Sequence, residues 1–199
     1  MAKMVQALKR FEFADASIYE YPRGWKRNEK TGDWAVSRAR FPEGLAPLKA
    51  KLDALRTHLL SEVWVTHNFM GWYDGFDHYK MNADLDLASW DWYIGTGKHD
   101  YTSTGAVHDL TRGFKRQNFW LIETQPGNVN WHPINNQVDK GESRTMAWHA
   151  VGHGADALLY WQWRSAYNGQ EQYHGSLVDQ SGQPRPFYAD AAQIGREFA

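Results

Sequence analysis

The chain of 199 residues contains no cysteine. Disulfide bonds and thiolate metal sites are therefore excluded together, and the redox compartment stays open. No stretch approaches the ~20 consecutive apolar residues of a membrane-spanning helix, so we expect no membrane partner. The first residues, Met-Ala-Lys-Met-Val-Gln, lack the apolar core of a signal peptide, which predicts a cytoplasmic location.

An excess of positive charge is also missing. Lys and Arg number 22 and Asp and Glu 23, for a formal net charge of −1, so nothing favours nucleic acid as a partner. The sequence has no G-x-G-x-x-G motif and no P-loop, which counts against a nucleotide-binding sheet. It also has no H-E-x-x-H motif, so we interpret its histidines as helix or loop residues and expect neither a metal nor a cofactor. The histidines weighed as metal ligands are His67, His132, His149 and His153.

Aromatic residues, in contrast, are plentiful. The chain has 11 Trp, 10 Tyr and 9 Phe, which together make 15% of its residues. Many of them could belong to the core. Clusters of aromatic rings at strand ends, however, are typical of carbohydrate sites, because the C–H faces of sugars pack on rings.

From Glu62 onward, predicted strands and helices alternate. Strands that end in polar residues, with helices between them, predict a parallel β/α arrangement with its site at the C-terminal strand ends. Candidate caps for the second helix are Ser103 and Thr104, and Gly154 is expected to end the third. The predicted strands cover residues 63–69, 85–93, 119–123 and 155–163, and the predicted helices cover 76–83, 104–116, 143–153 and 188–198. Earlier residues predict a helix at 4–11, a strand at 13–21, an irregular connection at 22–47 and a helix at 48–60.

The most informative stretch is Phe119-Trp-Leu-Ile-Glu-Thr-Gln-Pro-Gly-Asn-Val-Asn-Trp131. A buried strand here ends in one carboxylate, Glu123, and a charge in that place costs free energy unless it is paired or used. One alternative is a carboxylate that only caps a neighbouring helix. Trp131 downstream favours a sugar site, because a flat indole beside an acid suits a pyranose ring and its hydrolysis.

Several runs, taken in order, resemble glycoside hydrolase family 42 β-galactosidases over about residues 50–199. They are Trp64-Val-Thr-His-Asn-Phe-Met-Gly71, Asp84-Leu-Asp-Leu-Ala-Ser-Trp-Asp-Trp-Tyr93, Glu123-Thr-Gln-Pro-Gly-Asn-Val-Asn-Trp131, His153-Gly-Ala-Asp156, Trp161-Gln-Trp-Arg164 and Glu171-Gln-Tyr-His-Gly175. The resemblance implies a (β/α)8 barrel that hydrolyses terminal β-galactosides with retention of configuration. Its expected partner is therefore a small β-galactoside.

The resemblance also implies roles for individual residues. Glu123 takes the place of the nucleophile in the family's E-x-x-P-G segment, and Trp131 matches the Trp that lines the galactose subsite. Glu171 and His174 match the pair that holds galactose hydroxyls. Tyr93 falls on the aromatic end of the S-W-D-x-Y strand. A further candidate for lining the site is Asn68 in T-H-N-F.

The front of the chain departs from the family. Its acid/base Glu lies in an Asn-Glu-Tyr-Gly motif, and the nearest trace here is Ile18-Tyr-Glu-Tyr-Pro22, which makes Glu20 the candidate acid/base. On this alignment the chain supplies strands four to eight of the barrel. We therefore predict an α/β fold, a shortened or partial (β/α)8 TIM-barrel-like domain spanning residues 1–199, divergent over 1–60 and family-like over 61–199.

Three functional hypotheses remain open on the sequence alone. The chain is a compact β-galactosidase, a galactoside-binding remnant without acid catalysis, or an engineered or truncated barrel fragment without independent activity. A partial parallel barrel has unpaired sheet edges, which invite pairing with another strand. Self-association through an exposed edge, giving a homo-oligomer, is therefore expected, unless residues 1–60 cover the edge or the barrel closes with rearranged strands.

Overall fold

The computed structural model describes residues 50, 64–83 and 85–199. By their contacts the residues form two compact units. The first comprises Met1–Trp64 and Asp74–Asp77, most of which lies outside the described residues. The second comprises Val65–Tyr73 and His78–Ala199, and it contains the sheet and helices α3 to α6. Of the elements predicted before residue 61, only Ala50, which is helical, falls among the described residues.

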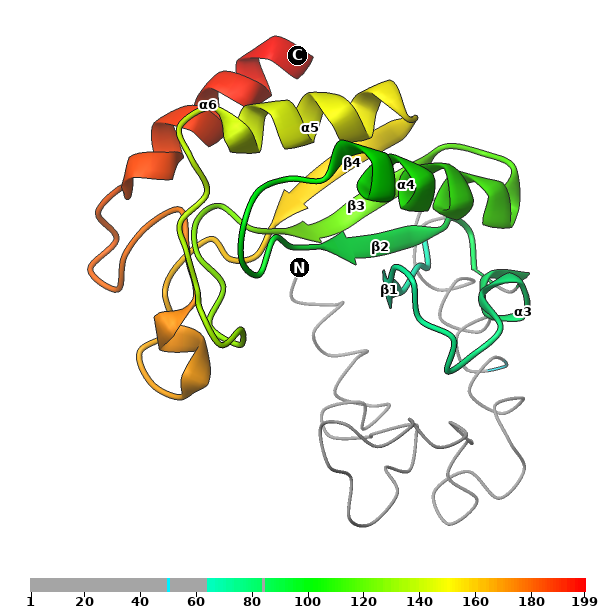
Figure 1. Cartoon of the computed structure of the whole chain (residues 1–199), viewed down its shortest axis with the longest axis horizontal. Helices are drawn as coiled ribbons and strands as arrows, with labels where there is room; N and C mark the ends of the chain where they lie inside the picture. The colour runs from blue at the N-terminus through cyan, green and yellow to red at the C-terminus, as the bar shows by residue number, and fades with distance from the viewer. Residues whose placement is uncertain (1–49, 51–63, 84) are drawn as a thin grey trace. The chain divides into compact units, whose positions relative to one another are not determined.

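A four-stranded parallel sheet forms the centre of the second unit. Its strands are β1 (Asn68–Met70), β2 (Ser89–Trp92), β3 (Phe119–Thr124) and β4 (Ala155–Tyr160), and they pair in the order β1-β2-β3-β4. The helices are α3 (His78–Ala83), α4 (Tyr101–Lys115), α5 (Glu142–Gly152) and α6 (Pro186–Phe198), with a 3₁₀ helix, η2, at Gln170–Tyr173. Figure 1 shows α4 and α5 over one face of the sheet. The predicted α/β fold with parallel strands is thus confirmed.

Three of the strands are shorter than predicted. Residues 64–67 precede β1 without regular strand structure, β2 covers only Ser89–Trp92 of the predicted 85–93, and β4 ends at Tyr160 rather than at residue 163. Trp161 N still donates to the Thr124 carbonyl of β3 at 2.9 Å, whereas Gln162 N donates to the Gly175 carbonyl at 3.4 Å. An aromatic run continues past the end of the strand, so composition alone did not mark the boundary.

Helix α4 begins earlier than predicted, and its cap is Asp100 rather than Ser103 or Thr104. The Asp100 carboxylate accepts from the backbone N–H groups of Thr102 and Ser103 at 3.0 and 3.1 Å. An aspartate at this place satisfies two of the free donors of the first turn. At the end of α5, Gly154 has a φ of 99°, which explains why the chain turns there as the sequence predicted.

The core lies between the sheet and the helices. Trp90, Phe119 and Leu121 are at most 1% exposed, and they point from β2 and β3 to the helix-covered face. The imidazole of His108 on α4 stacks on Phe119 at a centroid distance of 5.3 Å and meets Trp90 edge-on at 5.1 Å. Trp90 of β2 and Phe119 of β3 therefore anchor α4 on the sheet.

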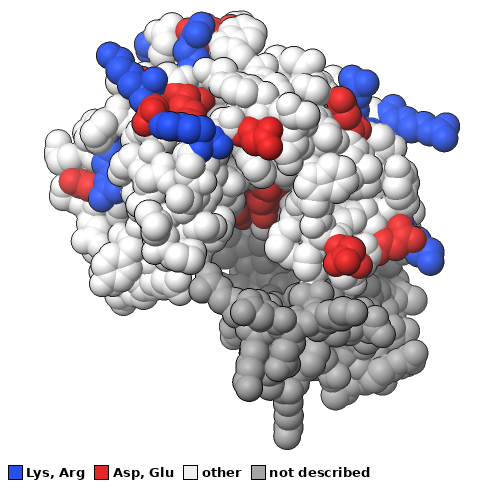
Figure 2. Space-filling model, in the orientation of Figure 1, with Lys and Arg blue, Asp and Glu red and all other residues white. Residues whose placement is uncertain are grey.

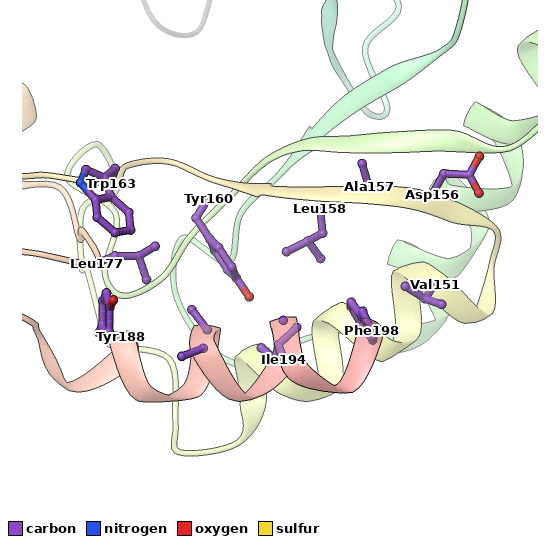
Figure 3. Close-up of a pocket in the computed structure, with 13 residues that line it drawn as sticks. Val151, Asp156, Ala157, Leu158, Tyr160, Trp163, Leu177, Tyr188, Ile194 and Phe198 are labelled. Carbon is purple, nitrogen blue, oxygen red and sulfur yellow. The ribbon is translucent and has the colours of Figure 1, made fainter.

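Helix α6 packs against the outer side of β4 and leaves an apolar pocket of about 380 Å³. Figure 3 shows Leu158 and Tyr160 pointing from β4 towards α6, where Ile194 lies. The Tyr160 hydroxyl is buried and has no hydrogen-bond partner within the described part of the chain. Within residues 64–83 and 85–199, no helix combines the length and the apolar character needed to cross a bilayer.

Candidate active site

Glu123 lies near the C-terminal end of β3, with its carboxylate held by two side chains from other strands. Asn68 Nδ2 at the start of β1 donates to Oε1 at 3.0 Å. The hydroxyl of Tyr93, directly after β2, donates to Oε2 at 2.8 Å. Each carboxylate oxygen therefore accepts from one of these two donors, which orients the group.

This arrangement does not fit the alternative that Glu123 merely caps a helix. The residues at the N-terminal caps of α4, α5 and α6 are Asp100, Gly141 and Arg185. Within the described residues, none of the ion pairs with Lys, Arg or His involves Glu123. Among the residues that the structure describes, the carboxylate is therefore oriented by neutral donors and not by a basic side chain.

Tyr93 connects Glu123 to the predicted sugar-binding side chains. Its ring meets Trp131 edge-on at 5.9 Å and His174 edge-on at 5.6 Å between centroids. Trp131 is 43% exposed, whereas His174 is 2% exposed. The partly exposed indole of Trp131 and the buried imidazole of His174 thus both contact the ring of Tyr93, whose hydroxyl donates to the carboxylate.

Glu171 approaches the same group from the 3₁₀ helix η2. Trp161 Nε1 donates to Glu171 Oε2 at 3.0 Å, and the negative charge of Glu171 is one of those that raise the pKa of Tyr93. His174 Nδ1 lies 3.0 Å from the Gly175 carbonyl oxygen, which can only accept, so Nδ1 carries a proton. In the neutral ring, Nε2 is then an acceptor.

The two loops that carry Trp131 and His174 are fixed to each other by their backbones. Gly175 N donates to the Asn128 carbonyl at 2.7 Å. A Cβ atom at Gly175 would lie 2.8 Å from both the N and the O of Asn128, so only glycine permits this approach. The side-chain amides of Asn128 and Asn130 also donate to the carbonyls of Tyr173 and Gln170, at 3.0 and 2.8 Å. The loop after β3 and the loop after β4 thus form one wall of the site.

Buried Gln125 joins the loop after β3 to the end of β2. Its Oε1 accepts from Ile94 N, and its Nε2 donates to the Gly127 carbonyl at 2.7 Å. The side chain is 1% exposed. Because the amide uses both its oxygen and its nitrogen, it fixes the backbone that follows Glu123.

A second carboxyl group, Asp91 on β2, is the register partner of Glu123. Burial and, next, the nearby charge of Glu123 raise the pKa of Asp91 to about 7, while a hydrogen bond with the Asn68 side chain acts in the opposite direction. Burial also raises the pKa of Tyr93, and its hydrogen bond to Glu123 adds to the effect. The Tyr93 hydroxyl therefore keeps its proton and remains a donor at all physiological pH values.

The face in Figure 2 agrees with this electrostatic pattern. Acidic side chains are visible in a central hollow, whereas the Lys and Arg side chains in this view lie towards the periphery, together with further acidic side chains. Negative charge in such a hollow suits a neutral substrate whose reaction develops positive charge.

The structure thus brings together Asn68, Tyr93, Glu123, Trp131 and His174, with Glu171 close by. Glu20 lies outside the described residues, so its predicted role stays a prediction, as do the roles of the others. Among the described residues there is no group of three or more His, Cys, Asp or Glu placed to hold a metal ion. His132, one of the histidines weighed as a ligand, instead lies 2.7 Å from the Thr96 hydroxyl.

Sequence reasoning gave no role to Asp91, Trp161 or Gln125. Two sequence features pointed towards Asp91: its place in the Ser-Trp-Asp-Trp-Tyr run and its parity with Tyr93 along the strand. What singles it out is the register of β2 against β3, including the irregularity between Trp90 and Asp91, and that register is not readable from one sequence.

Carboxylates and aromatic rings at the C-terminal ends of parallel strands define an α/β enzyme of the barrel type. The family model described as β-galactosidase, glycoside hydrolase family 42, matches residues 44–199. The chain therefore belongs to glycoside hydrolase family 42.

The chain is also similar to curated β-galactosidases. The β-galactosidase BgaH of Haloferax lucentense is 41% identical over 170 residues, covering 75% of this chain and 25% of that protein. A β-galactosidase of Thermus thermophilus is 36% identical over 167 residues, covering 76% and 26%. The chain spans about a quarter of the length of these relatives.

Two solved structures extend the likeness to the fold. The β-galactosidase of the Antarctic haloarchaeon Halorubrum lacusprofundi superposes with a TM-score of 0.70 at 35% identity, covering 89% of this chain and 29% of that one. The β-galactosidase of Bacillus circulans sp. alkalophilus superposes with a TM-score of 0.72 at 28% identity, covering 99% and 31%.

Proposed function

We propose that this chain carries the nucleophile side of a retaining β-galactosidase site, acting on terminal β-D-galactosides. The observation that carries the proposal is the Glu123 carboxylate, held by Asn68 and by Tyr93, whose ring contacts Trp131. The relatives named above are β-galactosidases, and the match includes the strands that bear these residues.

In this reaction an oxygen of Glu123 attacks the anomeric carbon and displaces the aglycone, forming a galactosyl ester. The leaving oxygen takes a proton from an acid, for which we propose Glu20, and the resulting carboxylate then activates the water that hydrolyses the ester. The acid and the nucleophile of a retaining enzyme lie about 5–5.5 Å apart.

The remaining side chains bind the sugar. Trp131 offers an apolar face for the galactose ring, and the Glu171 carboxylate and the His174 imidazole bind hydroxyl groups. Tyr93 and Asn68 hold the nucleophile in position, and the Tyr93 hydroxyl remains a donor because its pKa is raised.

A second function, galactoside binding without turnover, has its own support. The side chains that we propose to bind the sugar all belong to the unit formed by Val65–Tyr73 and His78–Ala199. If the acid were absent, this wall would still bind galactose.

A turnover assay on 4-nitrophenyl β-D-galactoside, paired with calorimetric titration of galactose, distinguishes the two functions. The enzyme function predicts release of nitrophenol that disappears in Glu123→Gln, with galactose binding retained. The matched control is Glu142→Gln, a carboxylate at the start of α5 that accepts from the backbone N–H groups of His99 and Asp139. Binding without nitrophenol release in the wild type supports the binding function, and absence of both contradicts the two functions together.

We further propose self-association through a sheet edge. Within the described residues, β1 and β4 each pair with one strand only. Parallel edges of this kind present unpaired N–H and C=O groups to a second chain. Light scattering coupled to size-exclusion chromatography at micromolar concentration tests this, and a monomeric mass counts against it.

A further inference from the structure

A carboxyl group that the proposed reaction does not use lies beside the nucleophile. Asp91 on β2 is the Cα register partner of Glu123 on β3, in a parallel sheet whose neighbouring strands run about 4.8 Å apart. Its Oδ1 is buried and has no hydrogen-bond partner within the described part of the chain. Burying a carboxylate oxygen without a hydrogen-bond partner costs folding free energy, so the presence of Asp91 beside Glu123 needs an explanation.

The two carboxyl groups share one donor. Asn68 Nδ2 donates to Glu123 Oε1 at 3.0 Å, and the same side chain lies close enough to Asp91 to act on it as a hydrogen-bond donor, which lowers the pKa of the Asp91 carboxyl. An amide nitrogen has two hydrogens and a carboxylate only accepts, so both bonds require the N–H₂ end of Asn68 to face this pair. Asp91 thereby selects the orientation of Asn68 that serves Glu123.

We propose that Asp91 is a positioning residue for Glu123. It orients the Asn68 amide towards the nucleophile, and its negative charge, when present, raises the free energy of ionised Glu123 and so accelerates the attack. This inference rests on the proposed β-galactosidase function. Asp91 does not touch the sugar. It acts through the Asn68 amide and through the electrostatic effect of its charge on Glu123.

The direction of the charge effect follows from the reaction. While Glu123 is ionised, an ionised Asp91 raises its free energy by like-charge repulsion. Attack on the anomeric carbon converts Glu123 into a neutral ester, which removes that repulsion, and the positive charge that develops on the sugar is stabilised as well. Ionised Asp91 therefore accelerates ester formation and, for the same reason, slows the return of Glu123 to its anion.

Because the pKa of Asp91 is raised to about 7, this effect appears across neutral pH. Below that pH, Asp91 holds a proton and the pair carries one negative charge. Above it, the proton passes to solvent and the pair carries two. Formation of the ester should then be faster above pH 7 than below it.

The first test is independent of turnover. Protein labelled with ¹³C at the side-chain carboxyls of Asp and Glu is titrated by NMR, with Asp91→Asn used to assign the Asp91 signal. We expect Asp91 to titrate near pH 7 in the wild type and at least about one pH unit lower in Glu123→Gln, a tenfold change in proton affinity. An unchanged midpoint in Glu123→Gln overturns the proposal, whatever the protein's activity.

The second test uses a 2-deoxy-2-fluoro-β-D-galactoside with a dinitrophenolate leaving group, which forms the Glu123 ester without needing an acid. The labelling rate, followed by intact mass, should rise about tenfold between pH 6 and 8 in the wild type and stay flat in Asp91→Asn. In Asp91→Ala, which also releases Asn68, the rate should fall about tenfold below that of Asp91→Asn.

The matched control is Asp156→Asn, because Asp156 on β4 also accepts from an asparagine, Asn118 Nδ2 at 2.7 Å, but has no nucleophile beside it. It should label with the wild-type pH profile. The same pH dependence in Asp91→Asn as in the wild type overturns the proposal. No labelling of the wild type at any pH contradicts the proposed function instead, and the NMR titration then decides the role of Asp91.

Discussion

Asn68 Nδ2 lies 3.0 Å from Glu123 Oε1, although the two residues are 55 positions apart in the sequence. The bond crosses the sheet from β1 to β3 and passes over β2, the strand that carries Asp91. Tyr93 completes the arrangement from the end of β2. The nucleophile candidate is therefore fixed by three parallel strands at once, which is the rigidity that a reacting group requires.

Tyr93→Phe removes the donor to Glu123 Oε2 while leaving a ring to pack against Trp131 and His174. A hydrogen bond to a charged group contributes about 1.5–3 kcal/mol, so kcat should fall about 10- to 100-fold with little change in KM. Steady-state kinetics on an aryl galactoside measures this. Tyr160→Phe, on the far side of β4 facing α6, is the control and should keep wild-type kinetics. Equal kinetics for Tyr93→Phe and the wild type would show that the bond does not serve catalysis.

Glu20→Gln tests the acid/base prediction, which lies outside the described residues. The loss of kcat/KM should be large for an alkyl galactoside and small for a dinitrophenyl galactoside, because a good leaving group needs little protonation. The ratio of the kcat/KM losses for the alkyl and the dinitrophenyl galactoside measures this difference. Equal losses on both would mean that Glu20 has a different role, and no loss on either would make it a residue outside the site.

Tyr160→Phe should leave stability unchanged or raise the free energy of unfolding by about 1 kcal/mol. The Tyr160 hydroxyl is buried without a partner among the described residues, so its removal takes away a desolvation cost and no hydrogen bond. Burial likewise raises the pKa of this phenol. Urea unfolding of the two proteins measures the difference. A loss of more than about 1 kcal/mol would reveal a partner for the hydroxyl.

Two buried histidines, His99 just before α4 and His108 on α4, make the free energy of unfolding depend on pH. Burial lowers the pKa of His99 to about 4 and of His108 to about 3, with the charge of His149 adding to both effects. The indole N–H groups of Trp92 and Trp90 donate to their Nδ1 atoms, so protonation there would also break these bonds. Below pH 6.5 the unfolded chain binds protons that the folded chain does not. The free energy of unfolding therefore decreases as the pH is lowered from 6.5 to about 4.

Thermal unfolding between pH 7.5 and 4.5 measures that loss, and we expect Tm to drop by about 5 °C or more. Asp91 acts in the opposite direction, because its raised pKa lets the folded chain bind a proton that the unfolded chain releases. Asp91→Asn removes this offset and should therefore steepen the fall in Tm. A Tm that is constant over this range, or a shallower fall in Asp91→Asn, contradicts the assignment.

The sequence predicted those parts of the fold and site that depend on local pattern. Strand β3 could be predicted because an apolar run ends in Glu123 and then Pro126-Gly127. Helix α4 could be predicted at residues 104–116, but its start could not, because Ser103 and Thr104 are also suitable caps and follow the true cap, Asp100. Glu123 and Trp131 stood out by residue type and by resemblance to a family.

The rest depends on contacts between distant segments. The pairing of Asp91 with Glu123 follows from strand register, and the close approach of Gly175 to Asn128 follows from two loops that meet. Neither the strand register nor the contact between the two loops can be read from a single sequence. For the same reason Gln125, which looks like an ordinary polar residue, could not be predicted as the buried link between two loops.

The most direct test of the central claim is to identify the residue that forms the galactosyl ester. The protein is incubated with the 2-deoxy-2-fluoro-β-D-galactoside, whose fluorine slows hydrolysis of the ester, then digested and sequenced by mass spectrometry. We expect the sugar mass on Glu123 and no adduct in Glu123→Gln. An ester on another carboxylate, or no ester on a protein that binds galactose, would contradict it.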